Sequence, residues 1–194
     1  MECIIAGNGP SLRSVPMSFL KQYPTFGTNR CYLKFTPDYY AVINHLVIRQ
    51  NLSDINNLSC MKFAREDMRV TGAQLKPSSR EPFSFAPLAW VNEGYTVTYV
   101  CLQLAYWMGF RTVFLVGLDH RYQYEGKPNE MRTMSDDPNH FDPSYFAGQQ
   151  WQNPDLENSA KYYAVARKVY ELDERKIINL TPDTALDVFE KGVP

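Results

Sequence analysis

The stretch from Thr96 to Gly117, TVTYVCLQLAYWMGFRTVFLVG, decides the class of fold. Its first part, Thr96 to Met108, is apolar on nearly every side, which is typical of a helix buried in a core. Gly109 stands where a glycine often ends a helix, and the β-branched run from Thr112 to Val116 predicts a central strand. A buried helix followed directly by a buried strand indicates an α/β protein.

Strands and helices alternate along the rest of the chain as well. The apolar patterns predict further strands at 3–6, 25–27, 39–43, 60–64 and 176–180, and helices at 11–22, 46–55 and 155–172. An edge strand is expected around Phe83–Phe85, and a terminal helix is expected from Pro182. This alternation predicts an open, mostly parallel sheet with helices on both faces. We expect a single Rossmann-like nucleotide-binding domain over residues 1–194, since this length fits one domain.

Composition excludes several classes of protein. Twenty basic and twenty-one acidic residues give a net charge of −1, which argues against a nucleic-acid-coating surface. No apolar run is long enough to span a bilayer, and the first residues lack the basic region of a signal peptide. We therefore expect a cytoplasmic protein. Four widely spaced cysteines without a Cys-x-x-Cys pair indicate reduced thiols rather than a zinc site or disulfides.

Small and polar residues follow the predicted strands. In an open parallel sheet, ligands bind at the carboxyl ends of the strands. The first strand runs into Gly7-Asn8-Gly9-Pro10-Ser11, where small residues would let backbone amides approach an anion. Asn29, Asn44 and Gly117-Leu118-Asp119 follow later strands. The alternative is that the glycines simply terminate strands, and the loop matches neither a dinucleotide fingerprint nor a P-loop.

A long polar segment separates the last two predicted strands. Residues 120–150 contain three prolines and show no period, so we expect a lid loop over the ligand. His140 lies within it, close to Asp136 and Asp137. A histidine side chain is well suited to act as a general base, although an ordinary loop histidine is the alternative.

Several of these segments resemble a known family. The run from Ile4 to Leu12 resembles the amino-terminal signature of the bacterial sialyltransferases of glycosyltransferase family 42. Counterparts follow in the same order at Phe26–Asn29, at Asn44, at 96–119 and at Asn139-His140-Phe141. The start is equally similar to the broader MptE-like family, which is named for archaeal 6-hydroxymethylpterin diphosphokinases.

The sialyltransferase resemblance implies an inverting transfer from a nucleotide-activated sugar to a glycan acceptor, without an obligatory metal. It also implies a role in surface polysaccharide or lipopolysaccharide synthesis. His140 would be the general base, and Tyr122 would stabilise the departing phosphate, with Tyr124 as the other candidate. The nucleotide would be held by Gly7, Asn8, Gly9, Pro10, Ser11, Asn29, Asn44, Thr96, Gly117, Asp119 and Arg121.

Two departures leave the donor sugar open, because Gly94 and Val97 stand where the family has an arginine and a serine. The MptE-like alternative is transfer of pyrophosphate from ATP to a 6-hydroxymethylpterin. Its magnesium would be held by Asp119, Asp136 and Asp137. A third reading is a non-catalytic nucleotide-binding module, in which His140 would be dispensable. The sequence is compatible with a homo-oligomer but does not indicate one.

Overall fold

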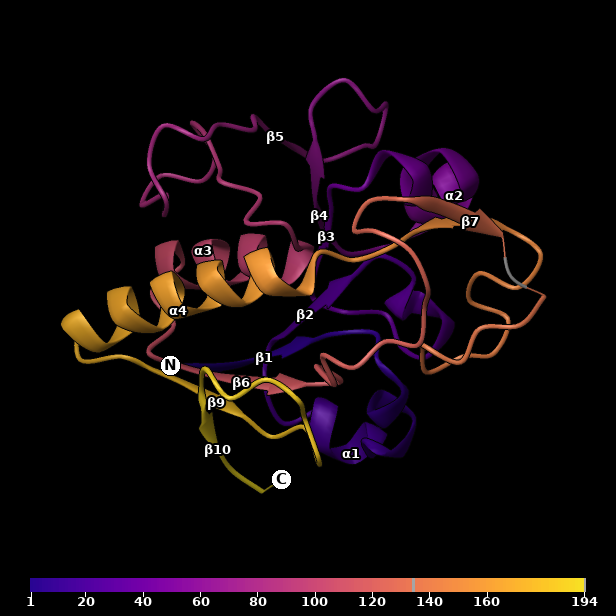
Figure 1. Ribbon diagram of the computed structural model, residues 1–194. Coiled ribbons are helices and arrows are strands. Elements are labelled where there is room, and N and C mark those ends of the chain that lie inside the picture. Colours follow the sequence, from indigo (N-terminus) through magenta and orange to yellow (C-terminus); the bar gives the residue numbers. More distant parts are fainter. Residues whose placement is uncertain (134, 194) are drawn as a thin grey trace.

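The computed structural model describes residues 1–133 and 135–193. Its main feature is an eight-stranded sheet of order β10-β9-β6-β1-β2-β3-β4-β5, in which every neighbouring pair is parallel (Figure 1). The strands are β1 (Glu2–Ala6), β2 (Thr25–Thr28), β3 (Tyr39–Val42), β4 (Met61–Arg65), β5 (Ala73–Leu75), β6 (Thr112–Val116), β9 (Lys176–Asn179) and β10 (Glu190–Lys191). This confirms the predicted α/β class with a parallel sheet. The loops after β1 and β6 leave in opposite directions, which creates the crevice where such sheets bind ligands.

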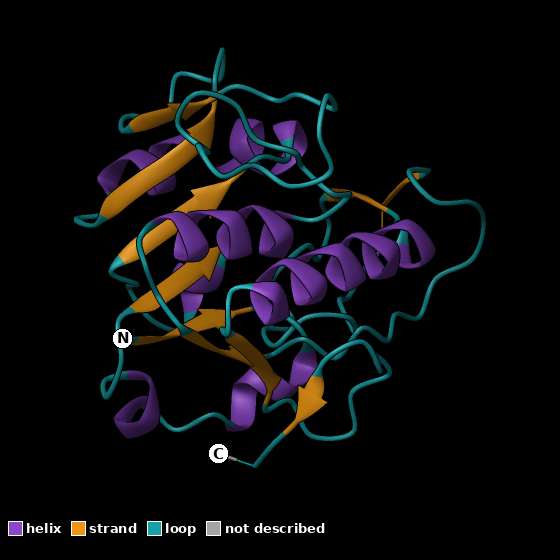
Figure 2. Cartoon of the chain, turned by 90° about the vertical axis from the view of Figure 1, so that its left-hand side faces the viewer, coloured by secondary structure: helices purple, strands orange, loops and turns teal. Residues whose placement is uncertain are grey.

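Helices cover both faces of the sheet. Helices α3 (Val97–Trp107) and α4 (Leu156–Leu172) lie side by side on one face (Figures 1 and 2). The other face is covered by α2 (His45–Asn57), a 3₁₀ helix (Pro10–Ser14) and α1 (Met17–Leu20). Since successive strand side chains point to opposite faces, Ile5 enters the α3/α4 core and Ile4 the other core.

The continuous helix predicted at 11–22 is wrong. A 3₁₀ turn and the four-residue α1 replace it, with Val15 and Pro16 in extended conformations between them. Proline has no N–H to donate and disfavours helical geometry in the residue before it. Pro16 therefore divides the segment.

The edge strand expected around Phe83–Phe85 is also wrong, because β5 forms that edge and the Phe83 ring packs edge-on to Tyr99 in the α3/α4 core. The terminal helix from Pro182 is absent from the described chain. There the Thr184 hydroxyl donates to the Leu118 carbonyl (2.7 Å), and the Ala185 amide donates to the Asp119 carbonyl (2.9 Å). These bonds hold the segment after Pro182 against the loop that follows β6 in a non-helical conformation.

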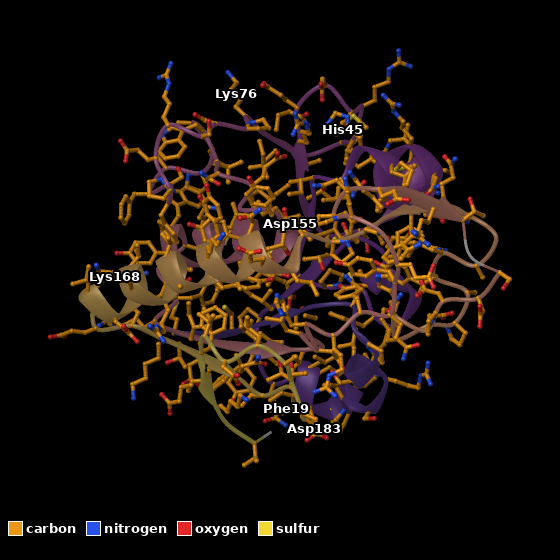
Figure 3. The ribbon with its side chains drawn as sticks, in the orientation of Figure 1. Phe19, His45, Lys76, Asp155, Lys168 and Asp183 are labelled. Atoms are coloured by element: carbon orange, nitrogen blue, oxygen red, sulfur yellow. The ribbon has the colours of Figure 1, made fainter. Side chains whose placement is uncertain are left out.

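The excursion at 120–150 lies beside the carboxyl ends of the strands (Figure 1). It contains β7 (Met131–Thr133), which pairs antiparallel with β8 (Gln150–Gln152) just beyond it. Its later part is packed rather than open, since Asp137, His140 and Tyr145 are buried. His45 and Asp155 lie at the starts of α2 and α4, nearer to this excursion than Lys168, which lies toward the other end of α4 (Figure 3).

Two further features of the structure concern membrane-spanning helices and cysteines. Among the helices of the described residues, none is long and apolar enough to cross a membrane. All four cysteines are free thiols in the structure, and Cys3, Cys31 and Cys101 are buried.

Candidate functional site

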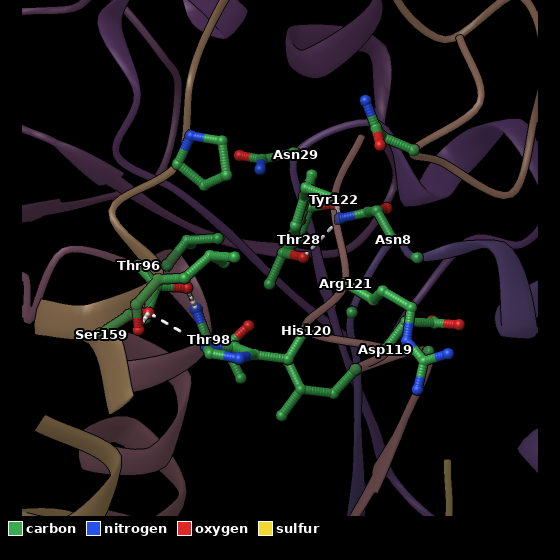
Figure 4. A pocket seen from close by; sticks show the side chains of 18 of the residues that line it. Asn8, Thr28, Asn29, Thr96, Thr98, Asp119, His120, Arg121, Tyr122 and Ser159 are labelled. Atoms are coloured by element: carbon green, nitrogen blue, oxygen red, sulfur yellow. Dashed lines mark hydrogen bonds between the residues drawn. The ribbon is translucent and has the colours of Figure 1, made fainter. Parts of the chain in front are cut away.

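Two adjoining cavities lie at the carboxyl ends of β1, β2 and β6. The inner cavity has a volume of about 100 Å³ and is lined in part by the loops that follow these strands (Figure 4). The outer cavity, of about 560 Å³, extends toward α2 and β8. They share the lining residues Asn29, Tyr95, Thr96, Val97, Tyr122, His140, Pro154 and Asp155. We treat them as one site with two compartments.

Asn8 and Asn29 present carboxamides to this site. Asn8 Nδ2 donates to the Thr28 hydroxyl (2.8 Å) and carbonyl (3.1 Å) (Figure 4). The Oδ1 atoms of both asparagines are buried, and neither has a hydrogen-bond partner among the described residues. A buried polar atom without a partner is costly, so a ligand or a water that brings donors would satisfy these two acceptors.

Asn44 lies in the outer compartment only. Its Oδ1 caps α2 by accepting from the amides of Leu46 (2.8 Å) and Val47 (3.2 Å). Because this oxygen is used by the helix, the side-chain NH₂ is the group that Asn44 can offer to a ligand.

The glycine loop packs two chain segments together. The Gly7 amide donates to Val116 (2.8 Å) and the Gly9 amide to Gly117 (2.9 Å). A Cβ added at Gly7 would lie 2.5 Å from the Gly117 carbonyl oxygen. Gly7, Gly9 and Gly117 line the inner cavity, whereas Pro10 and Ser11 line neither compartment. The glycines thus allow a close approach of two loops, and the amides of Gly7 and Gly9 are not available to an anion.

Asp119 joins the glycine loop to the end of β6. Its carboxylate accepts from the Ser11 amide (3.1 and 3.3 Å) and hydroxyl (2.7 Å). Arg121 lines the inner cavity from an exposed position and donates to the Asp183 carbonyl (2.9 Å). Asp119 therefore shapes the site through contacts within the protein, while Arg121 supplies a positive charge at its edge.

His140 is held by a buried carboxylate that sequence reasoning did not assign to it. Its Nδ1 lies 2.9 Å from Asp137 Oδ1 and 2.8 Å from Oδ2. The imidazole stacks on Tyr145, with ring centroids 4.1 Å apart and planes 6° apart. His140 lines both compartments, and Nε2 is the ring nitrogen that Asp137 does not occupy. This geometry suits a general base.

Tyr122 and Tyr124 have different positions. Tyr122 lines both compartments, and burial raises the pKa of its hydroxyl well above the usual value, so it remains a hydrogen-bond donor. Tyr124 donates to the Pro154 carbonyl (3.1 Å) and lines neither compartment. The structure therefore favours Tyr122 of the two candidates.

Thr96 belongs to a row of hydroxyl groups beside the inner cavity. It caps α3, and its hydroxyl lies 3.3 Å from the Tyr163 hydroxyl. His120 Nε2 lies 3.3 Å from the Ser159 hydroxyl (Figure 4), and burial lowers the pKa of this imidazole. The sequence analysis did not assign His120, Ser159 or Tyr163 to the site. The position of His120, directly after Asp119 near the end of a predicted strand, is the feature of the sequence that could have assigned it to the site.

The three aspartates considered as magnesium ligands do not gather. Asp119 binds Ser11, Asp137 binds His140, and Asp136 is an exposed neighbour of Ser135. Within residues 1–133 and 135–193, no group of three His, Cys, Asp or Glu side chains is placed to hold a metal ion.

Comparisons with known proteins bear on the fold. No family model matches the sequence, and no curated protein matches it. The sialyltransferase CstII from Campylobacter jejuni, in complex with the substrate analogue CMP-3FNeuAc, is 17% identical with a TM-score of 0.52, covering 100% of this chain and 86% of that one. A structure of the sialyltransferase CST-II in complex with CMP is 16% identical with a TM-score of 0.55, covering 100% and 87%. The chain therefore shares the α/β fold of these sialyltransferases along its whole length.

Proposed function

We propose that this protein is a sialyltransferase-like glycosyltransferase that uses a nucleotide-activated sugar. The observation that carries the proposal is the position of the His140–Asp137 pair. His140 lines both compartments together with Tyr122 and Asn29, whereas Asn8 lines the inner one, and Asp137 contacts His140 without lining either. The Oδ1 atoms of both asparagines have no partner among the described residues. A base, a protonated hydroxyl and carboxamide acceptors are the groups that such a transfer requires. The likeness in fold to two sialyltransferase structures, one with CMP and one with a CMP-sugar analogue, supports this choice.

In this proposal, the nucleotide reaches into the inner compartment, whose volume of about 100 Å³ holds only part of it. The Asn8 and Asn29 oxygens accept hydrogen bonds from hydroxyl or amino groups of the nucleoside. Arg121 brings positive charge to the edge of this compartment, which favours a phosphate there. The sugar and the acceptor then occupy the outer compartment, beside Asn44 and Val97.

The transfer step follows from the atoms that line both compartments. His140 Nε2 takes the proton of an acceptor hydroxyl, and the resulting oxygen attacks the anomeric carbon of the donor sugar. The bond from that carbon to the phosphate oxygen breaks, and the nucleotide leaves with the electron pair. The Tyr122 hydroxyl donates a hydrogen bond to the departing phosphate. Attack opposite to the leaving group inverts the anomeric centre.

The donor sugar and the pathway belong to the proposal as well. A carbon at Gly94 would lie 2.2 Å from the Tyr99 ring, so no longer side chain fits there without repacking. The apolar Val97 lines both compartments. Val97 is therefore the position that influences which sugar is accepted, whereas Gly94 lines neither compartment. Surface-polysaccharide synthesis is the pathway that the sequence resemblance suggests. No contact among the described residues specifically favours pyrophosphoryl transfer.

The test is calorimetric titration with CMP, UMP and ATP, each with and without magnesium. We expect CMP to bind, and we expect Asn29→Gly to weaken it about 5- to 150-fold, the equivalent of about 1–3 kcal/mol. Glycine suits this change because Asn29 has a φ of +48°. Asp67→Gly is the control, since Asp67 is exposed, also has positive φ, and lines neither compartment.

Other outcomes decide between the candidate functions. Binding of ATP with magnesium, but not of CMP, would replace glycosyl transfer with pyrophosphoryl transfer. Tight CMP binding without release of CMP from any CMP-sugar would instead leave a nucleotide-binding module.

A further inference from the structure

We propose that Asp137 is a positioning residue that holds His140 in the Nδ1–H tautomer, so that Nε2 is the basic atom in the site. The inference rests on the proposed function only where it concerns turnover. The tautomer itself is a property of the protein without any ligand.

The Asp137 carboxylate is surrounded by donors. Oδ1 accepts from the Asn139 amide (2.9 Å), and Oδ2 accepts from the Phe146 amide (3.1 Å). Both oxygens also lie within 3 Å of His140 Nδ1. The side chain is only 5% exposed, so solvent does not replace these contacts. The carboxylate oxygens of Asp137 can only accept hydrogen bonds, and each already accepts from one backbone amide. The contact with His140 therefore requires a proton on Nδ1, which acts as the third donor.

The imidazole is also fixed in rotation. Tyr145 stacks on one face of the ring, and the Tyr145 hydroxyl accepts from the Arg30 amide (2.9 Å). The Arg30 guanidinium donates to the Tyr145 carbonyl. Arg30 directly follows Asn29, so the histidine and a nucleotide-facing asparagine are supported by the same loop. The ring can therefore not turn freely to exchange its two nitrogens.

This arrangement has a chemical consequence for the base. With the proton on Nδ1, the Nε2 lone pair is available to take a proton from a hydroxyl group. Once Nε2 is protonated, the adjacent Asp137 carboxylate stabilises the positive imidazolium, and the proton later leaves Nε2 for solvent. Asp137 acts through His140 and touches no reacting atom.

The variant Asp137→Asn tests this directly. An asparagine keeps the shape, and its Oδ1 can still accept from the Asn139 amide. Its NH₂ then replaces Oδ2, so it faces Nδ1 and also leaves the Phe146 amide without its acceptor. The ring would then carry its proton on Nε2, which removes the base. Asp136→Asn is the matched control, because Asp136 is the adjacent, exposed carboxylate and contacts Ser135.

The measurement is nitrogen NMR of the histidine rings, read at neutral pH on the full chain, with His140→Gln used to assign the His140 signals. We expect Nδ1–H in the parent and in Asp136→Asn, and Nε2–H in Asp137→Asn. Turnover, measured as CMP release from a CMP-sugar, should fall about 10²- to 10⁴-fold in Asp137→Asn. CMP affinity should stay within a factor of about three in all variants.

The result that overturns the proposal is an Nε2–H tautomer in the parent, or an Nδ1–H tautomer that persists in Asp137→Asn. Asp137→Asn should also add little to His140→Gln in a double variant, since residues that act as a unit are not additive. If the parent shows the expected tautomer and its loss in Asp137→Asn but has no transferase activity, the proposed function fails while the positioning role stands.

Discussion

The side chain of Asp119 binds Ser11, a residue 108 positions earlier in the chain, through a hydroxyl–carboxylate contact of 2.7 Å. The same carboxylate accepts from the Ser11 amide. These bonds connect the loop after β1 with the loop after β6, at the point where the two strands send the chain in opposite directions. The floor of the inner cavity depends on this connection.

Replacing Asp119 by alanine should therefore destabilise the protein. The Ser11 amide and hydroxyl would both lose a charged acceptor, and we expect a loss of about 1.5–3 kcal/mol in the free energy of unfolding. Ser11→Ala removes only the hydroxyl bond and should cost less. Urea unfolding of the two variants checks the order, and equal losses would show that the amide contact contributes nothing.

The close approach of Gly7 and Gly117 predicts a steric effect. Gly7→Ala places a carbon 2.5 Å from the Gly117 carbonyl oxygen, so the backbone must move, and overpacking of this kind costs about 1–3 kcal/mol. Gly148→Ala is the control for nucleotide binding only, since the added carbon has nothing within 4 Å but the φ of +69° strains alanine there by itself. Thermal unfolding together with CMP titration measures both effects. We expect only Gly7→Ala to weaken nucleotide binding, and unaltered affinity in that variant would contradict the role of this contact in shaping the site.

The half-buried imidazole of His120 predicts a pH dependence of stability. Burial lowers its pKa in the folded protein, below the value of about 6.5 in the unfolded chain. The unfolded state therefore binds more protons as the pH falls through about 6.5, and the contribution of His120 to stability decreases there. His120→Asn should reduce the loss of stability between neutral pH and lower pH, and asparagine tolerates the φ of +52° at this position. Urea unfolding at several pH values checks this, and identical slopes for parent and variant would refute it.

The excursion at 120–150 remains a predicted lid, and its two parts should differ. The segment around Asp137 to Tyr145 is already buried, whereas Glu125 to Met131 is exposed. We expect saturating CMP to slow hydrogen exchange mainly in the exposed part. Exchange that is the same with and without CMP would make this part a plain surface loop.

The sequence predicted the strands that are apolar throughout, since burial on both faces leaves a signal that needs no knowledge of tertiary contacts. The expectation that the residues after β1, β2, β3 and β6 lie near one another has a different basis, because parallel strands bring their carboxyl ends to one edge of the sheet. The helix at 11–22 failed because apolar spacing outweighed Pro16. The strand at Phe83–Phe85 failed because aromatic residues suit a core as well as a strand.

The partner of His140 could not be predicted in the same way. Asp137 and Asp136 are adjacent in sequence and chemically identical, and only the turn at Asn139 and the packing of Tyr145 place one of them against the imidazole. Asn44 shows the opposite case. An asparagine directly before a predicted helix is a recognisable N-cap. The sequence therefore contained the signal for the helix-capping role of the Asn44 Oδ1 atom.

The sheet order has a consequence for the growing chain. Strand β1 has two neighbours, and β2 is synthesised soon after it, whereas β6 follows only after β5 and α3. The Phe141 amide, which binds the Asn8 carbonyl (3.0 Å), emerges from the ribosome later still. During translation, one edge of β1 therefore stays open for most of the time, and an open apolar edge readily pairs with other chains. A nascent chain halted before β6 should consequently recruit chaperones or aggregate more readily than one in which this strand is complete.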